Sequence, residues 1–184
     1  MSRVKKYLKA GLIILKYPSI NIDKSFNITA SNMIDFNARI VSGVSIGNVV
    51  INENISLYIN EMYSRFSVKI KSYFLPDGSE RKSYTVDNTL TVVTDKNGVI
   101  LSLGCNAHYQ GSYNGIIFPG MKIIDIIKLT TSQKIYNGSI IINDDFGVSF
   151  ILPPPYDEIA DAINYIPAGV IINEIFISDF SFWR

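Results

Sequence analysis

The sequence predicts an α+β domain that is rich in strands, with a mostly antiparallel or mixed sheet. Tyrosine (11 residues) and phenylalanine (10 residues) are plentiful, isoleucine is abundant and alanine is sparse, a balance that favours strands over helices. The chain also carries two strong hairpin signals and one segment with helical periodicity. We therefore expect at least six strands, which could curve into a half-barrel, with one or two short helices packed on the sheet.

The length and the apolar content predict one domain over residues 1–184. The chain has 184 residues, and 47% of them are hydrophobic, which is enough to bury a sizeable core. No stretch has the composition of a linker between two smaller domains.

The first third of the chain carries the weaker structural signals. Residues 11–17 are an apolar run that predicts a first strand, which Pro18 would end. Residues 36–46 and 49–51 predict short strands that glycines interrupt. Residues 55–63 fit a helix or a strand equally well.

A clearer pattern begins at residue 66. Phe66, Val68 and Ile70 alternate with polar residues, which predicts a half-buried antiparallel strand over residues 66–73. The sequence Pro76-Asp77-Gly78 predicts a turn, because proline sets the corner and glycine accepts a positive φ. Residues 84–86 could pair back across this turn.

Two hairpins and one helix follow. Residues 89–94 and 99–103 are β-rich runs joined by Asp95-Lys96-Asn97-Gly98, a strong hairpin signal. Residues 121–129 have a polar residue at every third position among apolar ones, which predicts a helix covering one face of the sheet. Residues 139–143 and 147–152 predict the second hairpin, with Gly147 in a left-handed conformation.

Turn-forming and strand-ending residues mark the limits of the last predicted elements. Asn137-Gly138 predicts a turn, and the three prolines at 153–155 end the preceding strand because none of them can donate a ladder hydrogen bond. Residues 156–163 predict a short helix with acidic residues in its first turn. Residues 170–177 predict a further strand, and Phe180, Phe182 and Trp183 are expected to pack on the core or to join an interface.

The composition predicts a soluble, cytoplasmic protein. The single cysteine, Cys105, excludes an intramolecular disulfide and a cysteine-rich zinc site, and it suits a reducing compartment. The basic N-terminus precedes an apolar patch, residues 11–15, that is too short for a signal-peptide core. No apolar run approaches the roughly 18 residues that a membrane-spanning helix needs.

Charge is balanced overall but is distributed unevenly along the chain. The 17 basic and 16 acidic residues give no indication of a nucleic-acid or membrane partner. From residue 140 onwards, however, the net charge is −6, whereas residues 1–139 carry +7. Such a chain can present an acidic face to a partner while it stays near neutral.

Sequence patterns of catalysis are weak, and we expect no enzyme, no cofactor and no metal site. Neither a Walker motif nor a dinucleotide-binding glycine pattern is present. The only histidine, His108, lies three residues after Cys105, a spacing that places the two side chains on opposite faces of an extended chain. Basic residues near aromatic ones at 63–74 fit a sheet with solvated lysines better than a site for single-stranded nucleic acid.

Acidic residues are concentrated between 144 and 161. They could supply paired carboxylates for glycoside hydrolysis or oxygen ligands for a metal, but turns and helix starts also favour acids at these positions. We predict instead that they bind a protein partner, with one tyrosine among them as an aromatic anchor. The predicted partner-binding residues are Asp144, Asp145, Tyr156, Asp157, Glu158 and Asp161.

Three strings of the sequence carry a resemblance to a known class of proteins. They are SLGCN (Ser102–Asn106), NGIIFPGM (Asn114–Met121) and PPYDEIAD (Pro154–Asp161). In these strings the chain resembles small immunity proteins of bacterial polymorphic-toxin and contact-dependent growth inhibition systems. The resemblance implies a cytoplasmic, non-enzymatic protein that binds one cognate toxin domain, often a nuclease, and blocks its active site or substrate access.

Two other functions fit the same residues. The chain could be a small-molecule-binding β domain or an enzyme, with a pocket under the helix at 121–129, or near His108 and the carboxylates of residues 144–161. It could also be a structural subunit of a larger assembly. A deep pocket near His108 would favour the first of these, and self-association would favour the second.

Overall fold

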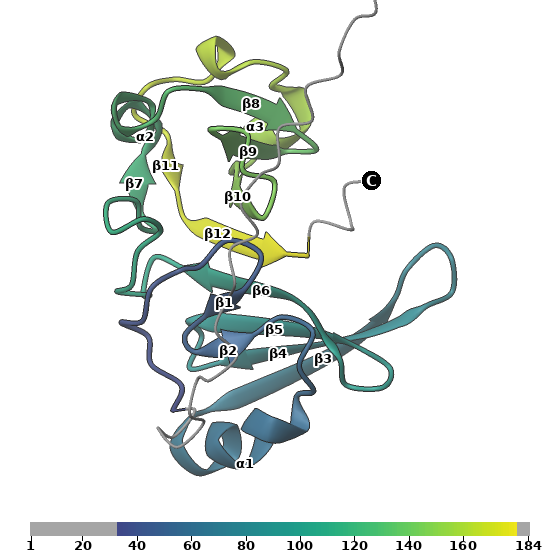
Figure 1. Ribbon diagram of the computed structural model, residues 1–184. Helices are drawn as coiled ribbons and strands as arrows, with labels where there is room; N and C mark the ends of the chain where they lie inside the picture. The colour runs from purple at the N-terminus through teal and green to yellow at the C-terminus, as the bar shows by residue number, and fades with distance from the viewer. Residues whose placement is uncertain (1–32, 180–184) are drawn as a thin grey trace, which may run out of the picture. The chain divides into compact units, whose positions relative to one another are not determined.

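The structure is a computed structural model, and it describes residues 33–179 (Figure 1). The predicted strand at 11–17 and the predicted packing of Phe180, Phe182 and Trp183 lie outside the described residues. The prediction of one domain over residues 1–184 also extends beyond them and stays a prediction.

The described residues confirm the α+β class, because they form one open eight-stranded antiparallel sheet with short helices. The strand order is β3-β4-β5-β6-β12-β10-β9-β8, so β3 and β8 are the edges. The strands are β3 (Val68–Phe74), β4 (Glu80–Val86), β5 (Leu90–Asp95), β6 (Ile100–Asn106), β8 (Gln133–Tyr136), β9 (Ser139–Ile142), β10 (Val148–Ile151) and β12 (Glu174–Ser178).

Two short ribbons and the helices complete the described fold. β1 pairs with β2, and β7 pairs with β11, each antiparallel. These elements and the helical segments are β1 (Ser45–Ile46), β2 (Val49–Val50), β7 (Met121–Lys122), β11 (Ile171–Ile172), α1 (Ser56–Arg65), α2 (Ile123–Leu129), α3 (Tyr156–Ile159) and the 3₁₀ turn η1 (Ile163–Tyr165).

The sheet consists of two meanders joined by a strand that comes later in the chain. β3 to β6 form the first meander and β8 to β10 form the second, each with sequential antiparallel neighbours. β12 then lies between β6 and β10 and pairs antiparallel with both (Figure 1). The predicted strand at 170–177 is therefore two strands, because the chain leaves the β7–β11 ribbon at Asn173 before it enters the sheet.

The helices differ in part from the expected ones. α2 starts at Ile123, two residues later than predicted, because Met121 and Lys122 pair with β11 instead. The helix predicted over residues 156–163 is only the four-residue α3, since Ala160 has extended backbone angles and ends it. The ambiguous segment at 55–63 belongs to α1, where Tyr58 and Met62 are fully buried one turn apart.

The expected turns are present, with one error of detail. The hairpin of β9 and β10 forms, but its left-handed residues are Asn143 and Asp144, and Gly147 is not among them. Asparagine and aspartate tolerate this conformation, and the Asn143 side chain also accepts hydrogen bonds from the backbone of Thr131 (2.8 Å) and Ser132 (3.2 Å). The prediction missed β8, which the left-handed pair Asn137-Gly138 joins to β9.

The segment at 36–51 contains little regular structure. The strands predicted over 36–46 and 49–51 reduce to the two-residue strands β1 and β2. Left-handed residues at Gly43, Gly47, Asn48 and Asn52 turn the chain too often for longer strands to form.

One face of the sheet carries the core in continuous cross-strand rows. The strand registers place buried residues side by side from β4 to β10. One row is Tyr84, Val92, Leu103, Ile177 and Val148, and the next is Val86, Leu90, Cys105, Ile175 and Phe150. The first row ends at Ile70 of β3, which is 52% exposed, and the second at Val68, which is partly buried. Most of the remaining residues of β3 are exposed, so the prediction of a half-buried strand at 66–73 is wrong for most of β3.

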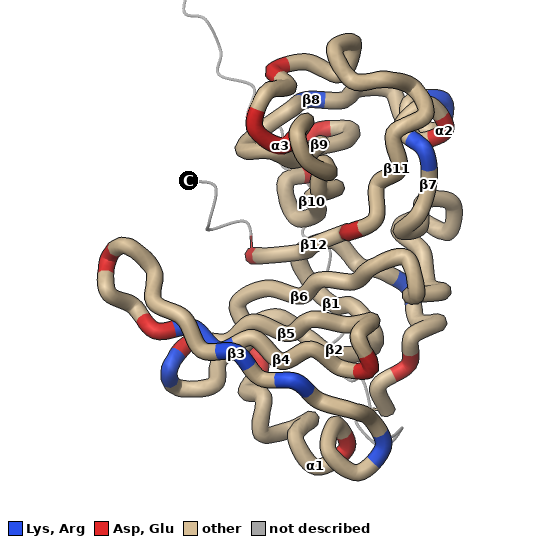
Figure 2. The backbone as a smooth tube through the Cα atoms, turned by 180° about the vertical axis from the view of Figure 1, so that it is seen from behind, with Lys and Arg blue, Asp and Glu red and all other residues tan. Residues whose placement is uncertain are grey.

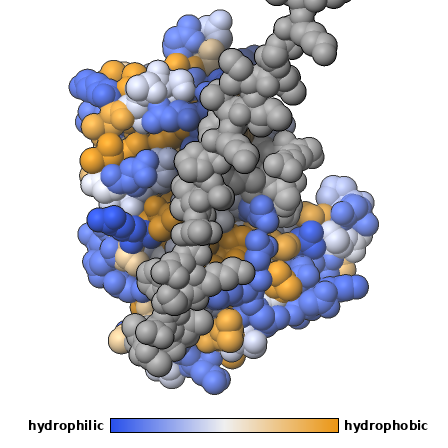
Figure 3. Space-filling model, in the orientation of Figure 1, coloured by the Kyte–Doolittle hydropathy of each residue, from blue (hydrophilic) through white to orange (hydrophobic). Residues whose placement is uncertain are grey.

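The opposite face of the first meander is open and polar. Its rows run through Lys71, Ser83, Val93, Ser102 and Ser178, and through Lys69, Thr85, Thr91, Gly104 and Phe176. Figure 3 shows the projecting β3–β4 hairpin as mostly hydrophilic, while apolar surface gathers over α2, β7 and β11. The open face is where the first candidate site lies.

Candidate functional site

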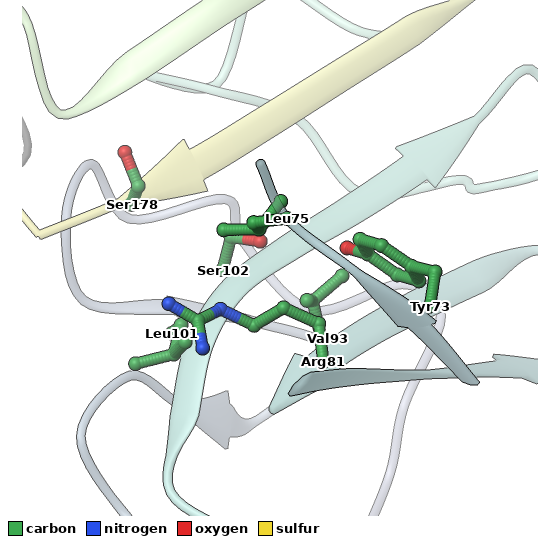
Figure 4. Close-up of a pocket in the computed structure, with 7 residues that line it drawn as sticks. All are labelled: Tyr73, Leu75, Arg81, Val93, Leu101, Ser102 and Ser178. Atoms are coloured by element: carbon green, nitrogen blue, oxygen red, sulfur yellow. The ribbon is translucent and has the colours of Figure 1, made fainter. Parts of the chain in front are cut away.

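A pocket lies on the open face where β3, β4, β5, β6 and β12 meet (Figure 4). Its volume is about 310 Å³, and every residue that lines it is partly buried. The lining consists of Tyr73, Leu75, Arg81, Val93, Leu101, Ser102 and Ser178. We call this the Arg81 pocket, because Arg81 supplies its only charged side chain.

Strand register and one β-bulge bring these residues together. Tyr73 lies opposite Arg81, and Val93 lies opposite Ser102, which in turn lies opposite Ser178. The register of β5 and β6 shifts between Val93 and Thr94, and Leu101 is the extra residue of the bulge. A bulge changes the direction of a side chain, and this one brings Leu101 beside Ser102 in the pocket lining.

Among residues 33–179, the Arg81 guanidinium has no acidic partner. Its printed hydrogen bond is a donation to the backbone carbonyl oxygen of Glu80, at 3.0 Å. In the described part of the chain, no carboxylate oxygen lies within 4.0 Å of it. In Figure 4 the side chain extends from β4 toward Leu101 and Ser102.

Two acidic residues near Arg81, apart from the adjacent Glu80, are held by their own turns. Asp95, opposite Arg81 on β5, accepts hydrogen bonds from the backbone nitrogens of Asn97 (2.9 Å) and Val99 (2.8 Å). Asp77 accepts from Ser79, and these bonds, with a smaller contribution from the charge of Arg81, lower the pKa of Asp77. Arg81 therefore keeps most of its hydrogen-bonding capacity.

The predicted acidic residues do not act alike, and Asp145 has a structural role. It accepts hydrogen bonds from the hydroxyl groups of Ser42 (2.5 Å) and Tyr113 (2.7 Å) and from the backbone nitrogen of Gly147 (3.0 Å). Asp145 thus ties the β9–β10 turn to two distant segments. Burial, with the bond to Asp145, raises the pKa of Tyr113 to about 12.

The other predicted acids lie in different surroundings. Asp144 is exposed and forms an ion pair with Lys134. Glu158 and Asp161 are exposed, whereas Asp157 is partly buried, and its Oδ1 atom is buried without a hydrogen-bond partner. Tyr156 is partly buried against the core. Figure 2 shows acidic residues around α3 and the β9–β10 turn, and basic residues along β3 and β4.

A second pocket, of about 520 Å³, lies between β8 and the segment that follows α3. Lys134 and Tyr136 line it from β8, and Asp161 and Ile163 line it from the other side. Large side chains remain exposed in β8, in α3 and in the segment that follows α3: Tyr136 (47%), Ile159 (65%) and Tyr165 (69%). We define the β8–η1 patch as Tyr136, Glu158, Ile159, Asp161 and Tyr165.

Sequence reasoning found the acids of this patch but missed its apolar members. Ile159, in the helix predicted over 156–163, and Tyr165, beyond it, were assigned to no site. The Arg81 pocket was missed too. Its signal was the adjacent pair Ile100 and Leu101, which breaks the alternation of β6 and indicates a bulge.

The Cys105 and His108 pair is not assembled. Cys105 is buried in the core row of β6, and burial raises the pKa of its thiol to about 12. His108 is exposed beyond the end of β6. A thiolate nucleophile needs a lowered pKa, so Cys105 is unsuited to that chemistry, and residues 33–179 contain no group of three or more metal-ligating side chains.

Comparison with protein-family models, with curated proteins and with solved structures gives no significant match to this chain. Within residues 33–179, no helix has the length and apolar content that crossing a membrane requires. The functional inference therefore depends on the residues themselves.

Proposed function

We propose that this chain is an immunity protein, which binds a cognate antibacterial toxin domain 1:1 and blocks its active site or substrate access without catalysis of its own. The observation that carries the proposal is the β8–η1 patch, where three large side chains stay exposed beside two carboxylates. The resemblance of PPYDEIAD (Pro154–Asp161) to such proteins falls on the same surface.

The patch has the composition that protein interfaces favour. Aromatic residues in the centre of an interface supply most of its binding energy, and acids at the rim speed the encounter with a basic partner. Nuclease toxins bind a polyanion, so their active sites are basic. From residue 140 to residue 179 the chain has seven acidic residues and no lysine or arginine, which suits such a partner.

The structure also changes which of the predicted residues can contact a protein partner. Asp144, Glu158 and Asp161 are exposed and could reach a partner. Asp145 is used internally by Ser42 and Tyr113, so its charge reversal would damage the fold rather than report on binding. Tyr136 and Tyr165 are better anchors than Tyr156, which packs on the core.

The test begins with purification of the tagged full-length chain from its native host and identification of any protein that accompanies it at equal stoichiometry. That protein is then purified alone, its affinity is measured by calorimetry, and its enzymatic or toxic activity is assayed with and without this chain. The proposal requires both tight 1:1 binding and inhibition. Binding without inhibition, or the absence of a stoichiometric partner, would reject it.

A matched pair of variants tests the location of the interface. Tyr165→Ala on the patch should weaken binding at least tenfold, as truncation of an aromatic anchor does. Tyr63→Ala, on α1 and 53% exposed, is the control and should leave the affinity unchanged. Charge reversal at Glu158 and Asp161 should slow association and reduce its salt dependence. Equal effects of the two tyrosine variants would place the interface elsewhere.

A further inference from the structure

The Arg81 pocket is not explained by a protein interface at the β8–η1 patch, because the two sites involve different strands. The pocket is lined from β3 to β6 and β12, whereas the patch involves β8, α3 and η1. We propose that the pocket binds a small organic carboxylate with an apolar or aromatic body. This inference is independent of the proposed immunity function.

Charge is the first argument for an anionic ligand. The guanidinium of Arg81 is partly buried and lacks a carboxylate within 4.0 Å among the described residues. A charged group in such a place is costly unless it is paired or well solvated. Lys69 and Lys71 lie on the same face of β3 and add positive potential, while Asp95 and Asp77 are held by their turns.

The shape and lining select the class of anion. Leu75, Val93 and Leu101 give the pocket apolar walls, and the ring of Tyr73 closes one side (Figure 4). A pocket of about 310 Å³ is at the small end of known ligand sites. The Arg81 guanidinium and the hydroxyl groups of Ser102 and Ser178 can satisfy a singly charged carboxylate, whereas a phosphate dianion would leave charge unpaired.

The arrangement of side chains suggests how the ligand lies. The guanidinium can donate two parallel hydrogen bonds to a carboxylate, and the neighbouring Ser102 hydroxyl can donate a third. The apolar body then lies over Val93 and toward Tyr73 and Leu75.

The experiment uses the full-length chain and 3-phenylpropanoate as the probe, with the neutral 3-phenylpropanamide as its matched analogue. Binding is measured by calorimetry and by chemical-shift changes in two-dimensional NMR spectra. We expect saturable 1:1 binding of the carboxylate, with shift changes in the residues of the pocket. The amide should bind at least about tenfold more weakly, since it lacks the charge-assisted hydrogen bonds.

Two variants with the same change in net charge separate the pocket from general electrostatics. Arg81→Gln should weaken carboxylate binding at least about tenfold. Lys82→Gln is the control, because Lys82 is the next residue of β4 and points to the other face of the sheet. Ser102→Leu should abolish binding by filling the pocket without changing any charge, and Tyr165→Ala should bind the probe as the wild type does.

Several outcomes would overturn the proposal. One is the absence of saturable binding at probe concentrations up to about 10 mM, which exceeds any dissociation constant expected of a specific site. Another is equal affinity of the Arg81→Gln and Lys82→Gln variants, and a third is equal affinity for the acid and the amide. Circular dichroism of each variant confirms that it is folded. None of these results would bear on toxin binding at the β8–η1 patch.

Discussion

The two meanders on either side of β12 are built in the same order but are buried differently. Each is preceded by a helix, α1 or α2, and each contains a tight hairpin turn with two consecutive left-handed residues, Asp87-Asn88 or Asn137-Gly138. In the first meander β3 is mostly exposed, whereas in the second all four residues of β9 are buried. An edge strand of one meander and an inner strand of the other thus occupy opposite environments.

The apolar pattern of a strand therefore indicates which of its faces can be buried. The elements that pack against the strand decide whether those faces are buried. β9 reads Ser-Ile-Ile-Ile, a continuous run typical of a strand covered on both faces. β3 alternates as a half-covered strand should, yet Ile70 is exposed because the β3–β4 hairpin extends beyond the helix and loops that cover the core face (Figure 1).

The largest test of this comparison is truncation of one apolar side chain in each meander. Phe150 of β10 is fully buried, with an edge-on contact to the ring of Tyr113 at a centroid distance of 6.0 Å. We expect Phe150→Ala to lower the free energy of unfolding by about 3–5 kcal/mol. Ile70→Ala on β3 should cost about 0.5 kcal/mol or less, since surface substitutions are usually small. Chemical denaturation measures both, and similar losses would contradict the contrast.

A pair of turn glycines gives the next largest effect. Gly138 and Gly78 are both left-handed, with φ of 72° and 80°. Alanine at Gly78 should cost about 1–2 kcal/mol, because nothing lies near the new Cβ and only the backbone strain remains. Alanine at Gly138 should cost more, because its Cβ would lie 2.8 Å from the carbonyl oxygen of Asp157. The thermal unfolding midpoints of the two variants give the order of their stability losses. The reverse order would show that α3 moves away from the new Cβ at little cost in free energy.

Removal of the Tyr113 hydroxyl tests the link between the second meander and the loop that follows β6. Tyr113→Phe deletes the 2.7 Å hydrogen bond to Asp145, while Asp145 keeps its bonds from Ser42 and Gly147. We therefore expect a loss of about 1 kcal/mol in the free energy of unfolding. A combined Tyr113→Phe and Ser42→Ala variant should lose more than the sum of the single losses, because Asp145 then keeps only the backbone bond.

Alkaline pH should weaken the fold through the same tyrosine. Its pKa is raised from 10.0 to about 12, and that of Cys105 from 9.0 to about 12, mainly by burial. Because the folded state holds these protons more tightly, stability is fully present below pH 9 and falls as the pH rises toward 12. Denaturation midpoints measured between pH 8 and 12 should fall less steeply in Tyr113→Phe than in the wild type.

The smallest predicted effect is a gain in stability in the first meander. Thr94 is fully buried at the bulge, and its Oγ1 atom has no hydrogen-bond partner. Thr94→Val should stabilise the protein by up to about 1 kcal/mol, because it removes an unsatisfied polar atom at nearly constant volume. A loss of stability would show that an ordered water satisfies this hydroxyl.

Local structure could be predicted from the sequence where local chemistry decides it. The turns at Pro76-Asp77-Gly78 and at Asp95-Lys96-Asn97-Gly98 formed as expected, because glycine and aspartate bring the required backbone angles and hydrogen bonds with them. The helix ending at Leu129 was found because polar residues recur at every third position among apolar ones, which is also a local pattern. The insertion of β12 could not be found, since the partners of Ile175 lie 70 and 25 residues earlier in the chain, Cys105 and Phe150 respectively.

The candidate sites depended on such distant pairings. Asp145 was predicted to face a partner, and only the fold shows that Tyr113 and Ser42 approach it. Arg81 is one of several basic residues in the sequence, and nothing near it in the chain indicates that Ser178 lines the same pocket. The partner-facing role of the remaining acids and tyrosines stays a prediction.

The position of β12 has a consequence for synthesis of the chain. Both meanders are synthesised before Glu174–Ser178, and until β12 pairs with them β6 and β10 each present a free edge. Free edges recruit other strands, and pairings distant in sequence form slowly. During this interval the nascent chain is most open to mispairing with its neighbours on a polysome, and a chaperone that shields strand edges would raise the yield of folded protein.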